Sequence, residues 1–225
     1  MTRLYLVRHC EARGNADRVF HGRTDSDISD KGKEQLLFLC ERFSTISLDA
    51  IVTSPLKRAV QTAEAVRGDR ELPLTTDRDL MEIHVGEWED KPFRCFPAEF
   101  PTLSLCWNME PWAFSPETGE SMAAVYARVS AALMRIAQSH PDQTVAVVSH
   151  GCAIRNMLCF AHGWPIERLN DIDWCDNTGV ALIEFDGAHM TVCFENDASH
   201  LTDIMSTIKH QAWWKKENRD NNEFE

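Results

Sequence analysis

The chain has 225 residues, 26% of them charged and 44% hydrophobic, a balance typical of a globular protein long enough to bury a core unaided. Its formal net charge of -12 argues against nucleic acid as a partner, because a phosphate backbone requires a basic surface. We find no apolar signal region at the N-terminus and no run long enough to span a bilayer, so we expect a cytoplasmic protein without membrane association. The eight cysteines form no C-x-x-C pair, which argues against zinc-ribbon and thioredoxin-type sites.

The first expected strand is the apolar run Leu4–Val7, which ends in Arg8-His9. A buried strand seldom carries two such polar residues. In an open α/β sheet, ligands bind beyond the carboxyl ends of the parallel strands, and the guanidinium group of Arg8 suits phosphate or carboxylate. The strand end is therefore a candidate site.

A polar loop over residues 15–29 follows, and it contains His21 and Gly22. It is long for a plain surface connection, and long loops beside a strand end often bind substrate. Ser29 or Asp30 is then expected to cap a helix whose apolar residues recur at helical spacing.

Two further short strands are expected at residues 50–53 and 73–76, with a helix between them. Ser54-Pro55 should open that helix, with the proline in the first turn, where its missing N–H costs nothing. Arg58 lies one turn inside the helix, and on local grounds alone its charge is best interpreted as solvated. The loop after the third strand carries four carboxylates, three of which we expect to be structural or solvated: Asp79, Glu82, Glu87 and Glu89.

Residues 90–116 interrupt the regular pattern with five prolines and six phenylalanine or tryptophan residues. The segment is too aromatic to be disordered and too rich in proline to form one long helix. We interpret it as an insertion of short helices folded over the sheet. Most of its aromatic side chains should pack onto the body, and one or two should face the pocket.

A second histidine at a strand end occurs in the C-terminal half. After an amphipathic helix over about residues 121–140, the apolar strand Thr144–Ser149 ends in His150-Gly151. The helix Gly151–Ala161 follows, so His150 lies at a helix N-terminus, a position that favours anions. Two strands with a histidine at each tip can bring both imidazoles to one edge of a sheet.

Residues 179–185 and 190–195 favour a hairpin around Asp186-Gly187, which we expect to supply two edge strands. We find no internal repeat and expect a single domain over residues 1–225.

The C-terminal extension, residues 197–225, has a weaker pattern, compatible with one more helix and a frayed polar end. Within it, Trp213-Trp214 could dock on the body or on a partner subunit. The edge strands and these tryptophans allow a homodimer without requiring one.

The stretch Arg8-His9-Cys10-Glu11, with Asn15 following, resembles the Arg-His-Gly-Glu signature of the histidine phosphatase superfamily, which includes the phosphoglycerate mutases. Any one matching stretch would be weak evidence, but several in the family's order are specific, and they extend from the first strand to about Glu195. The supporting stretches are Gly22–Asp25, Thr53–Ala63, Leu80–Glu82 before Gly86–Glu89, and Ser149–Gly151.

This resemblance implies a three-layer α/β/α sandwich with a mostly parallel central sheet and a helical, aromatic-rich insertion over the active site, at about residues 90–116. It implies that His9 is the nucleophile and Glu82 the general acid and base. It also implies that Arg8, Arg58 and His150 stabilise the phosphoryl charge. The other residues expected to bind the substrate or its phosphate are Asn15, His21, Gly22 and Gly151.

The expected activity is that of a phosphomonoesterase, which hydrolyses a small phosphate ester through a phosphohistidine intermediate on His9. Guanidinium groups would neutralise the transferred phosphoryl group, so we expect neither a metal nor another cofactor. The partner is then a small phosphorylated substrate, and the aromatic insertion hints at an apolar or ring-bearing leaving group.

Two other functions stay open. The family's mutases continue after the acid as Glu-Arg-His-Tyr-Gly, whereas this chain has Glu-Ile-His-Val-Gly at residues 82–86, which favours hydrolysis over cofactor-dependent phosphoglycerate mutase activity. A non-catalytic relative that binds phosphorylated partners is disfavoured because all five proposed catalytic residues are present.

Cys10 is a departure from the family pattern, since it stands where glycine is usual. We favour a small buried side chain there, tolerated if the local φ is negative. A reactive thiol is the alternative, because cationic surroundings lower a thiol pKa.

Overall fold

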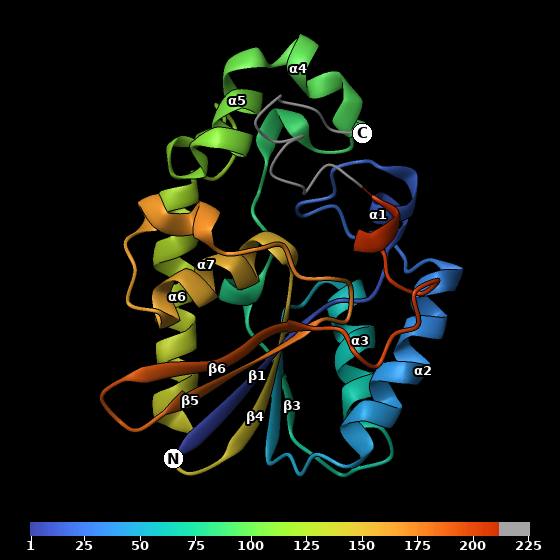
Figure 1. The fold of residues 1–225 in the computed structure, drawn as a ribbon, viewed down its shortest axis with the longest axis vertical. Coiled ribbons are helices and arrows are strands. Elements are labelled where there is room, and N and C mark those ends of the chain that lie inside the picture. Colours follow the sequence, from blue (N-terminus) through green and yellow to red (C-terminus); the bar gives the residue numbers. More distant parts are fainter. Residues whose placement is uncertain (212–225) are drawn as a thin grey trace.

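The computed structural model describes residues 1–211, and within this range six strands form one mixed sheet (Figure 1). The sheet order is β3-β2-β4-β1-β5-β6. The first four of these strands pair in parallel, and the last two are antiparallel, which confirms the mostly parallel sheet. The strands are β1 (Thr2–Arg8), β2 (Ala50–Thr53), β3 (Leu74–Thr76), β4 (Thr144–Ser149), β5 (Val180–Phe185) and β6 (Met190–Asp197).

The expectation of two C-terminal edge strands is wrong for one of them. β6 is an edge of the sheet, but β5 lies between β1 and β6. β5 has apolar side chains on both faces, with Val180, Ala181 and Ile183 all buried, as an interior strand requires. Along β6, by contrast, partly exposed and exposed residues alternate in the first part of the strand.

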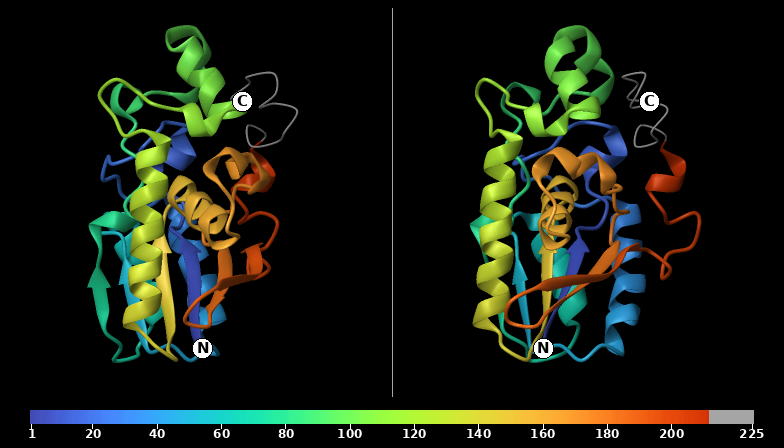
Figure 2. Two further views of the ribbon diagram at one scale, coloured as in Figure 1. Left: turned by 90° about the vertical axis from the view of Figure 1, so that its left-hand side faces the viewer. Right: turned by 60° about the vertical axis from the view of Figure 1, so that its left-hand side comes forward.

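Helices cover both faces of the sheet, so the expected three layers are present (Figures 1 and 2). Leu4 and Leu6 of β1 point into the core shared with α6 and α7, whereas Val7 points into the core shared with α2 and α3. This alternation is the period of two that a strand buried on both faces shows. Within the described range the helices are α1 (Arg13–Asp17), α2 (Asp30–Ser44), α3 (Lys57–Arg67), α4 (Phe96–Glu99), α5 (Pro101–Met109), α6 (Met122–Ser139) and α7 (Gly151–Ala161).

Two helix starts show how local chemistry sets the boundaries. Ser29 caps α2 as expected, because its hydroxyl accepts the Gly32 N–H. The expected start of α3 is wrong: Pro55 precedes the N-cap, Leu56, and the helix begins at Lys57. The Ser54 hydroxyl accepts the Leu56 N–H, so a side chain closes this turn in place of helical backbone bonds.

The aromatic insertion folds into short helices beyond the carboxyl ends of the parallel strands (Figure 1). Its rings pack on one another and on the body: Phe96 stacks on Trp88 with ring centroids 4.0 Å apart, and Trp107 meets Phe114 edge-on at 5.0 Å. Trp88, Phe96 and Phe114 are fully buried. The insertion is thus held by its own aromatic core and by the residues just before it.

After β6 the chain runs as a strap, defined here as residues 198–211, past α2 toward α1 (Figures 1 and 2). The expected helix is replaced by turns and one short 3₁₀ helix, Ile208–His210. Side chains of the body form hydrogen bonds with the strap's backbone: Gln35 donates to the Met205 carbonyl, and Asp176 accepts the Thr207 N–H. The expectations for Trp213-Trp214 and for the polar end lie outside the described residues.

Among the described residues, no helix is both long and apolar enough to cross a membrane. All eight cysteines are free thiols.

Candidate active site

The register of two strands brings the two histidines together. β1 and β4 pair in parallel with Arg8 opposite Ser149, so the residues that follow, His9 and His150, leave the sheet side by side. Their ring centroids are 5.0 Å apart. Both side chains are buried, at 5% and 0% exposure. This is the edge of the sheet at which an α/β fold binds ligands.

The surroundings of His9 select one nitrogen as the reactive one. Nδ1 lies 2.6 Å from the Cys10 carbonyl oxygen, which can only accept, so Nδ1 carries the proton and Nε2 keeps its lone pair. Burial, followed by the charges of Arg58 and Arg8, holds the pKa of His9 well below its usual value. His9 is therefore a neutral imidazole with Nε2 able to act as a nucleophile.

His150 combines a filled and an unfilled hydrogen-bonding position. Its Nε2 lies 2.7 Å from the Ser54 hydroxyl, whereas its buried Nδ1 has no hydrogen-bond partner within residues 1–211. Burial and then the Arg58 charge hold the pKa of His150 well below its usual value. For His150 to stabilise the phosphoryl charge as a cation, as the resemblance implies, a bound phosphate dianion must raise this pKa.

Two buried guanidinium groups face the histidines. Arg8 donates to the Cys175 carbonyl at 2.5 Å, and its Nε is a buried donor without a partner in the described part of the chain. Arg58 is 1% exposed and donates to the Thr24 and Gly22 carbonyls, each at 2.8 Å. Arg58 therefore fixes the loop after α1 as well as contributing charge to the site.

Glu82 reaches the same place through the N-terminus of α7. Its carboxylate accepts backbone N–H groups from Cys152 and Ala153 of that helix, both at 3.1 Å, and from Ile83 at 2.9 Å. The positive end of the helix faces the carboxylate. Arg128, which sequence reasoning did not single out, donates to the Glu82 carbonyl at 3.1 Å and so holds this loop from behind.

Most of the predicted site residues open onto one cleft of about 780 Å³, part of it open to solvent. Two of them, His150 and Gly22, are buried and are not among the residues that line it. The predicted residues that line the cleft are Arg8, His9, Asn15, His21, Arg58, Glu82 and Gly151.

Close packing requires glycine at position 22, whereas a Cβ at Gly151 would meet nothing nearer than 3.3 Å. A Cβ on Gly22 would lie 2.3 Å from the Ile83 carbonyl oxygen, and one on Gly151 would lie 3.4 Å from Nε of Arg8. Gly22 thus gives its carbonyl to Arg58 and allows the loop to approach Ile83.

Asn15 and His21 lie in the wall of the cleft. The side-chain oxygen of Asn15 accepts the Ala12 N–H at 3.1 Å, which leaves its NH₂ group as the donor end of the amide. His21 lies 3.4 Å from the Asp90 carboxylate through Nε2, and burial lowers its pKa.

The outer part of the cleft is aromatic and comes from several distant segments. Phe93 and Trp107 of the insertion line it, in agreement with the expected one or two. Arg18, Val19 and Phe20 also line it, from the polar loop that was expected to bind substrate. Sequence reasoning missed the remaining lining residues, since no local motif marks them. They are Ala12, Gly14, Cys152, Trp174, Thr207, Ile208 and Gln211.

Cys10 lies beneath the site as a buried thiol. It is 0% exposed, its N–H donates to the Thr62 hydroxyl at 3.0 Å, and it is not among the described residues with positive φ. Burial raises the pKa of Cys10 to about 11. The reactive-thiol alternative required a shift in the opposite direction, so the small buried side chain is the better interpretation.

Metal ligands do not gather at this site. Across residues 1–211, no three His, Cys, Asp or Glu side chains come together in a group that could hold a metal ion.

Comparison with known proteins identifies the family. The model of the histidine phosphatase superfamily (branch 1) matches residues 4–198. Phosphoserine phosphatase 1 of Hydrogenobacter thermophilus is 32% identical over 89% of this chain and 95% of its own length, and phosphoglycerate mutase-like protein 4 of Arabidopsis thaliana is 31% identical over 88% and 86%. The solved structure of Bacillus stearothermophilus YhfR is 34% identical and superposes with a TM-score of 0.85, over 89% of this chain and 99% of that one. The chain therefore belongs to the histidine phosphatase superfamily, and it is a phosphatase.

Proposed function

We propose that this protein is a metal-independent phosphomonoesterase that hydrolyses a small phosphate ester through a phosphohistidine on His9. One observation carries the proposal: a buried, neutral imidazole presents Nε2 to a cleft that is also lined by Arg8, Arg58 and Glu82. A nucleophile, positive charge and a proton carrier are the three groups that phosphoryl transfer by covalent catalysis needs.

In the first step, Nε2 of His9 attacks phosphorus and the bond from phosphorus to the leaving oxygen breaks. Glu82, in its acid form, gives that oxygen its proton, and the alcohol leaves. Arg8, Arg58 and His150 stabilise the charge on the transferred phosphoryl group, and Asn15 donates a neutral hydrogen bond.

In the second step, water attacks the phosphorus of phosphohistidine. Glu82, now a carboxylate, takes a proton from that water, the bond from phosphorus to Nε2 breaks, and inorganic phosphate leaves. Glu82 regains the acid form and His9 the neutral form, so the cycle closes without a cofactor.

Cofactor-dependent phosphoglycerate mutase activity is the second candidate, and the similarity to a phosphoglycerate mutase-like protein keeps it under test. It would use the same phosphohistidine. Residues 82–86 lack the arginine and tyrosine of the mutase pattern, which is why we place hydrolysis first. A bisphosphoglycerate primer that supports isomerisation of phosphoglycerate faster than its hydrolysis would reverse this order.

The test is hydrolysis of an aryl phosphate in the presence of a chelator, with the His9→Ala variant beside the wild type. We expect wild-type turnover, a loss of about 10³-fold or more in the variant, and a phosphoryl group on His9 in alkali-quenched wild-type enzyme by mass spectrometry. His189→Ala is the matched control, because His189 is exposed and far from the cleft in its hairpin turn. Equal turnover in wild type and His9→Ala would refute the proposed mechanism.

A further inference from the structure

All of the strap except its first residue lies beyond the part of the chain that the family model matches, yet the strap forms part of the cleft wall. The match ends at residue 198. Thr207, Ile208 and Gln211 nevertheless line the cleft together with His9 and Glu82. A wall supplied from outside the shared domain is a place where substrate preference can be set without altering the catalytic groups.

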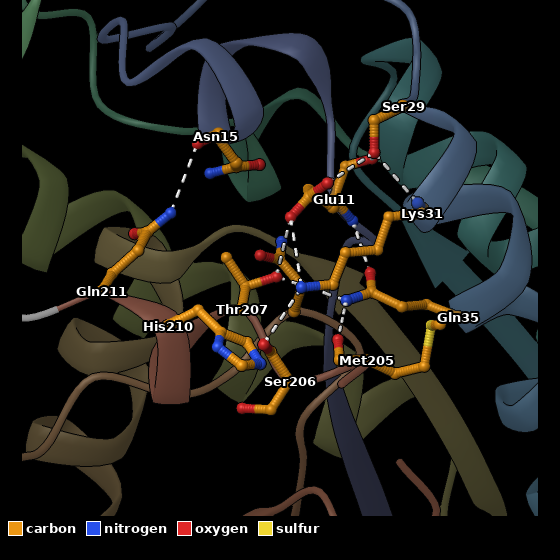
Figure 3. Close-up of polar contacts among 12 residues, drawn as sticks. Glu11, Asn15, Ser29, Lys31, Gln35, Met205, Ser206, Thr207, His210 and Gln211 are labelled. Atoms are coloured by element: carbon orange, nitrogen blue, oxygen red, sulfur yellow. Dashed lines mark hydrogen bonds and ion pairs between the residues drawn. The ribbon is translucent and has the colours of Figure 1, made fainter. Parts of the chain in front are cut away.

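Two buried carboxylates, Glu11 and Asp176, anchor the strap, and Figure 3 shows the contacts of Glu11. Glu11, 6% exposed, accepts the Thr207 hydroxyl at 3.1 Å and the Ser29 hydroxyl at 2.7 Å. Asp176, 4% exposed, accepts the N–H groups of Thr207 and Ile208 at 2.9 and 3.2 Å, together with the Ser206 hydroxyl. Hydrogen bonds from several donors to one buried carboxylate fix a backbone in place more firmly than surface contacts do.

A fully buried amide adds a third anchor. The side-chain oxygen of Gln35 accepts the Glu11 N–H at 2.8 Å, and its NH₂ group donates to the Met205 carbonyl at 2.8 Å and to the Thr207 hydroxyl at 3.3 Å. Gln35 is 0% exposed. Its side chain is therefore committed at both ends, one to the loop after β1 and the other to the strap (Figure 3).

These anchors tie the strap to the catalytic residues through very short paths. Glu11 is two residues after His9, and Asp176 follows Cys175, whose carbonyl accepts the guanidinium group of Arg8. The hydrogen bonds to Glu11 and Asp176 therefore fix the position of the strap relative to the phosphate-binding groups.

One apolar side chain of the strap, that of Ile208, continues the apolar end of the cleft. Ile208 packs against the hydrophobic core that contains Trp107 and Trp174, both of which line the cleft. Gln211 donates from its side chain to the Asn15 carbonyl at 3.4 Å and so joins the strap to α1 (Figure 3). No strap residue that lines the cleft carries a charge, whereas the phosphate end has two guanidinium groups.

We propose that Ile208 and Gln211 are specificity-determining residues that contact the leaving group of the phosphate ester and select esters with an apolar face. This inference rests on the proposed function, because it assigns the leaving-group side of the same site. The phosphate is held by Arg8 and Arg58, so the strap acts on the choice of alcohol and not on the capture of phosphate.

The test compares two substrates and one inhibitor in Ile208→Ala and Gln211→Ala. The substrates are an aryl phosphate, with an apolar leaving group, and phosphoserine, with a small polar one, and the inhibitor is inorganic phosphate. Ile208→Ala should lower kcat/KM for the aryl phosphate about tenfold and for phosphoserine by less than about threefold, as expected for lost apolar contact. The inhibition constant of inorganic phosphate should stay within about twofold of the wild type.

Gln211→Ala should also change the ratio of the two kcat/KM values and leave inhibition by phosphate unchanged. Lys209→Ala is the matched control, since Lys209 is exposed, pairs with Asp203 and is not part of the cleft wall. Thr207→Val should reproduce the altered ratio by releasing the anchor, and Thr207→Ser, which retains the hydroxyl, should restore it.

An equal fall in kcat/KM for both substrates, together with weaker inhibition by phosphate, would refute the proposal. It would show that the strap only stabilises the fold of the site. Unchanged ratios in all the strap variants would refute it as well. Failure of the proposed function would show differently, as no turnover of either ester by the wild type. In that event the same comparison is made by titrating the ester and inorganic phosphate onto each variant, where a selective loss of ester binding supports the role of the strap.

Discussion

The two ends of the cleft are built in different ways. At the phosphate end, His9 and His150 follow paired strands, and Glu82 is held by the first turn of α7. At the outer end, the wall is assembled from the loop after α1, the aromatic insertion and the strap. The reactive groups thus lie at strand ends and against a helix N-terminus, whereas the outer wall comes from loops and an insertion, segments that can differ without disturbing those groups.

The first way to sharpen this comparison is to remove the proton carrier and leave the phosphate end otherwise intact. Glu82→Gln should lower kcat about 10²–10⁴-fold for an alkyl phosphate, whose leaving oxygen needs a proton. For an aryl phosphate the first step should suffer less, because a phenolate leaves without protonation. Phosphohistidine should then accumulate, since water attack still needs the base.

The measurement is a rapid-quench time course with each substrate, and a burst of phenol in Glu82→Gln is the expected sign. Glu87→Gln is the control, because Glu87 accepts the backbone N–H groups of Glu117 and Thr118, the Thr118 hydroxyl and the backbone of its own turn at the surface, and it does not line the cleft. Equal losses for the two substrates without a burst would show that Glu82 does not transfer the proton.

The second prediction concerns Arg58, whose guanidinium group contributes charge at the phosphate end and also holds the loop after α1 at the outer end. Arg58 holds the Thr24 and Gly22 carbonyls with a planar fork that lysine cannot reproduce. Arg58→Lys should therefore lower kcat/KM about 10–100-fold although the positive charge is kept.

The matched control is Arg67→Lys on the same helix, where Arg67 pairs with Glu64 at the surface and should be replaceable without effect. The measurement is kcat/KM for the aryl phosphate in both variants, and only Arg58→Lys should show a loss. Full activity in Arg58→Lys would mean that the charge alone matters and that the loop needs no anchor from α3.

The phosphate end could be predicted from the sequence because its geometry follows from local rules. A polar pair after an apolar strand, repeated at His150, places two histidines at one sheet edge, and the family resemblance supplied Arg58 and Glu82. The strand order could not be obtained in this way: β5 has the short apolar pattern of a hairpin strand, and only its pairing with β1 makes it interior.

The aromatic insertion over the site was expected, but the strap's part of the outer end could not be predicted, because the contacts that shape it join distant residues. Thr207 meets Glu11 across 196 positions of the chain, and Asp176 takes the strap's N–H groups that a helix would otherwise use. Trp174 has no neighbouring pattern that marks it as a wall of the cleft. The one signal in the sequence for the strap's position was Glu11 in the Arg-His-Cys-Glu stretch, because a carboxylate buried there must accept hydrogen bonds from another segment of the chain.

The third prediction uses the burial of the two histidines at the phosphate end. Their pKa values lie well below 6.5 in the folded protein, whereas in the unfolded chain they take up protons near that value. The unfolded state therefore binds more protons as the pH falls below 6.5. The free energy of unfolding should decrease by up to about 1.4 kcal/mol per pH unit for each histidine until the folded-state pKa is reached.

Urea unfolding at pH values from about 7.5 down to about 5 measures this slope. His9→Asn and His150→Asn should each flatten it, whatever they do to stability at neutral pH, and His189→Asn should not. The same shifts predict that the acid limb of kcat/KM lies below pH 6.5, because His9 stays neutral and nucleophilic there. An unchanged slope in both variants would mean that these histidines titrate normally.

The smallest expected effect is at Cys10, which follows His9 in the chain but is fully buried and does not line the cleft. Because burial raises the pKa of Cys10 to about 11, the side chain stays a thiol at neutral pH, and an alkylating reagent should not inactivate the folded enzyme. Cys10→Ser should change kcat/KM less than about threefold, since a small side chain still fills the space and the backbone bond to Thr62 remains. Cys10→Gly should likewise keep the kinetics and lose a little stability through the added backbone freedom. Rapid inactivation by the reagent, protected by inorganic phosphate and absent in Cys10→Ser, would instead show a thiolate in the site and would place Cys10 among the groups that touch the substrate.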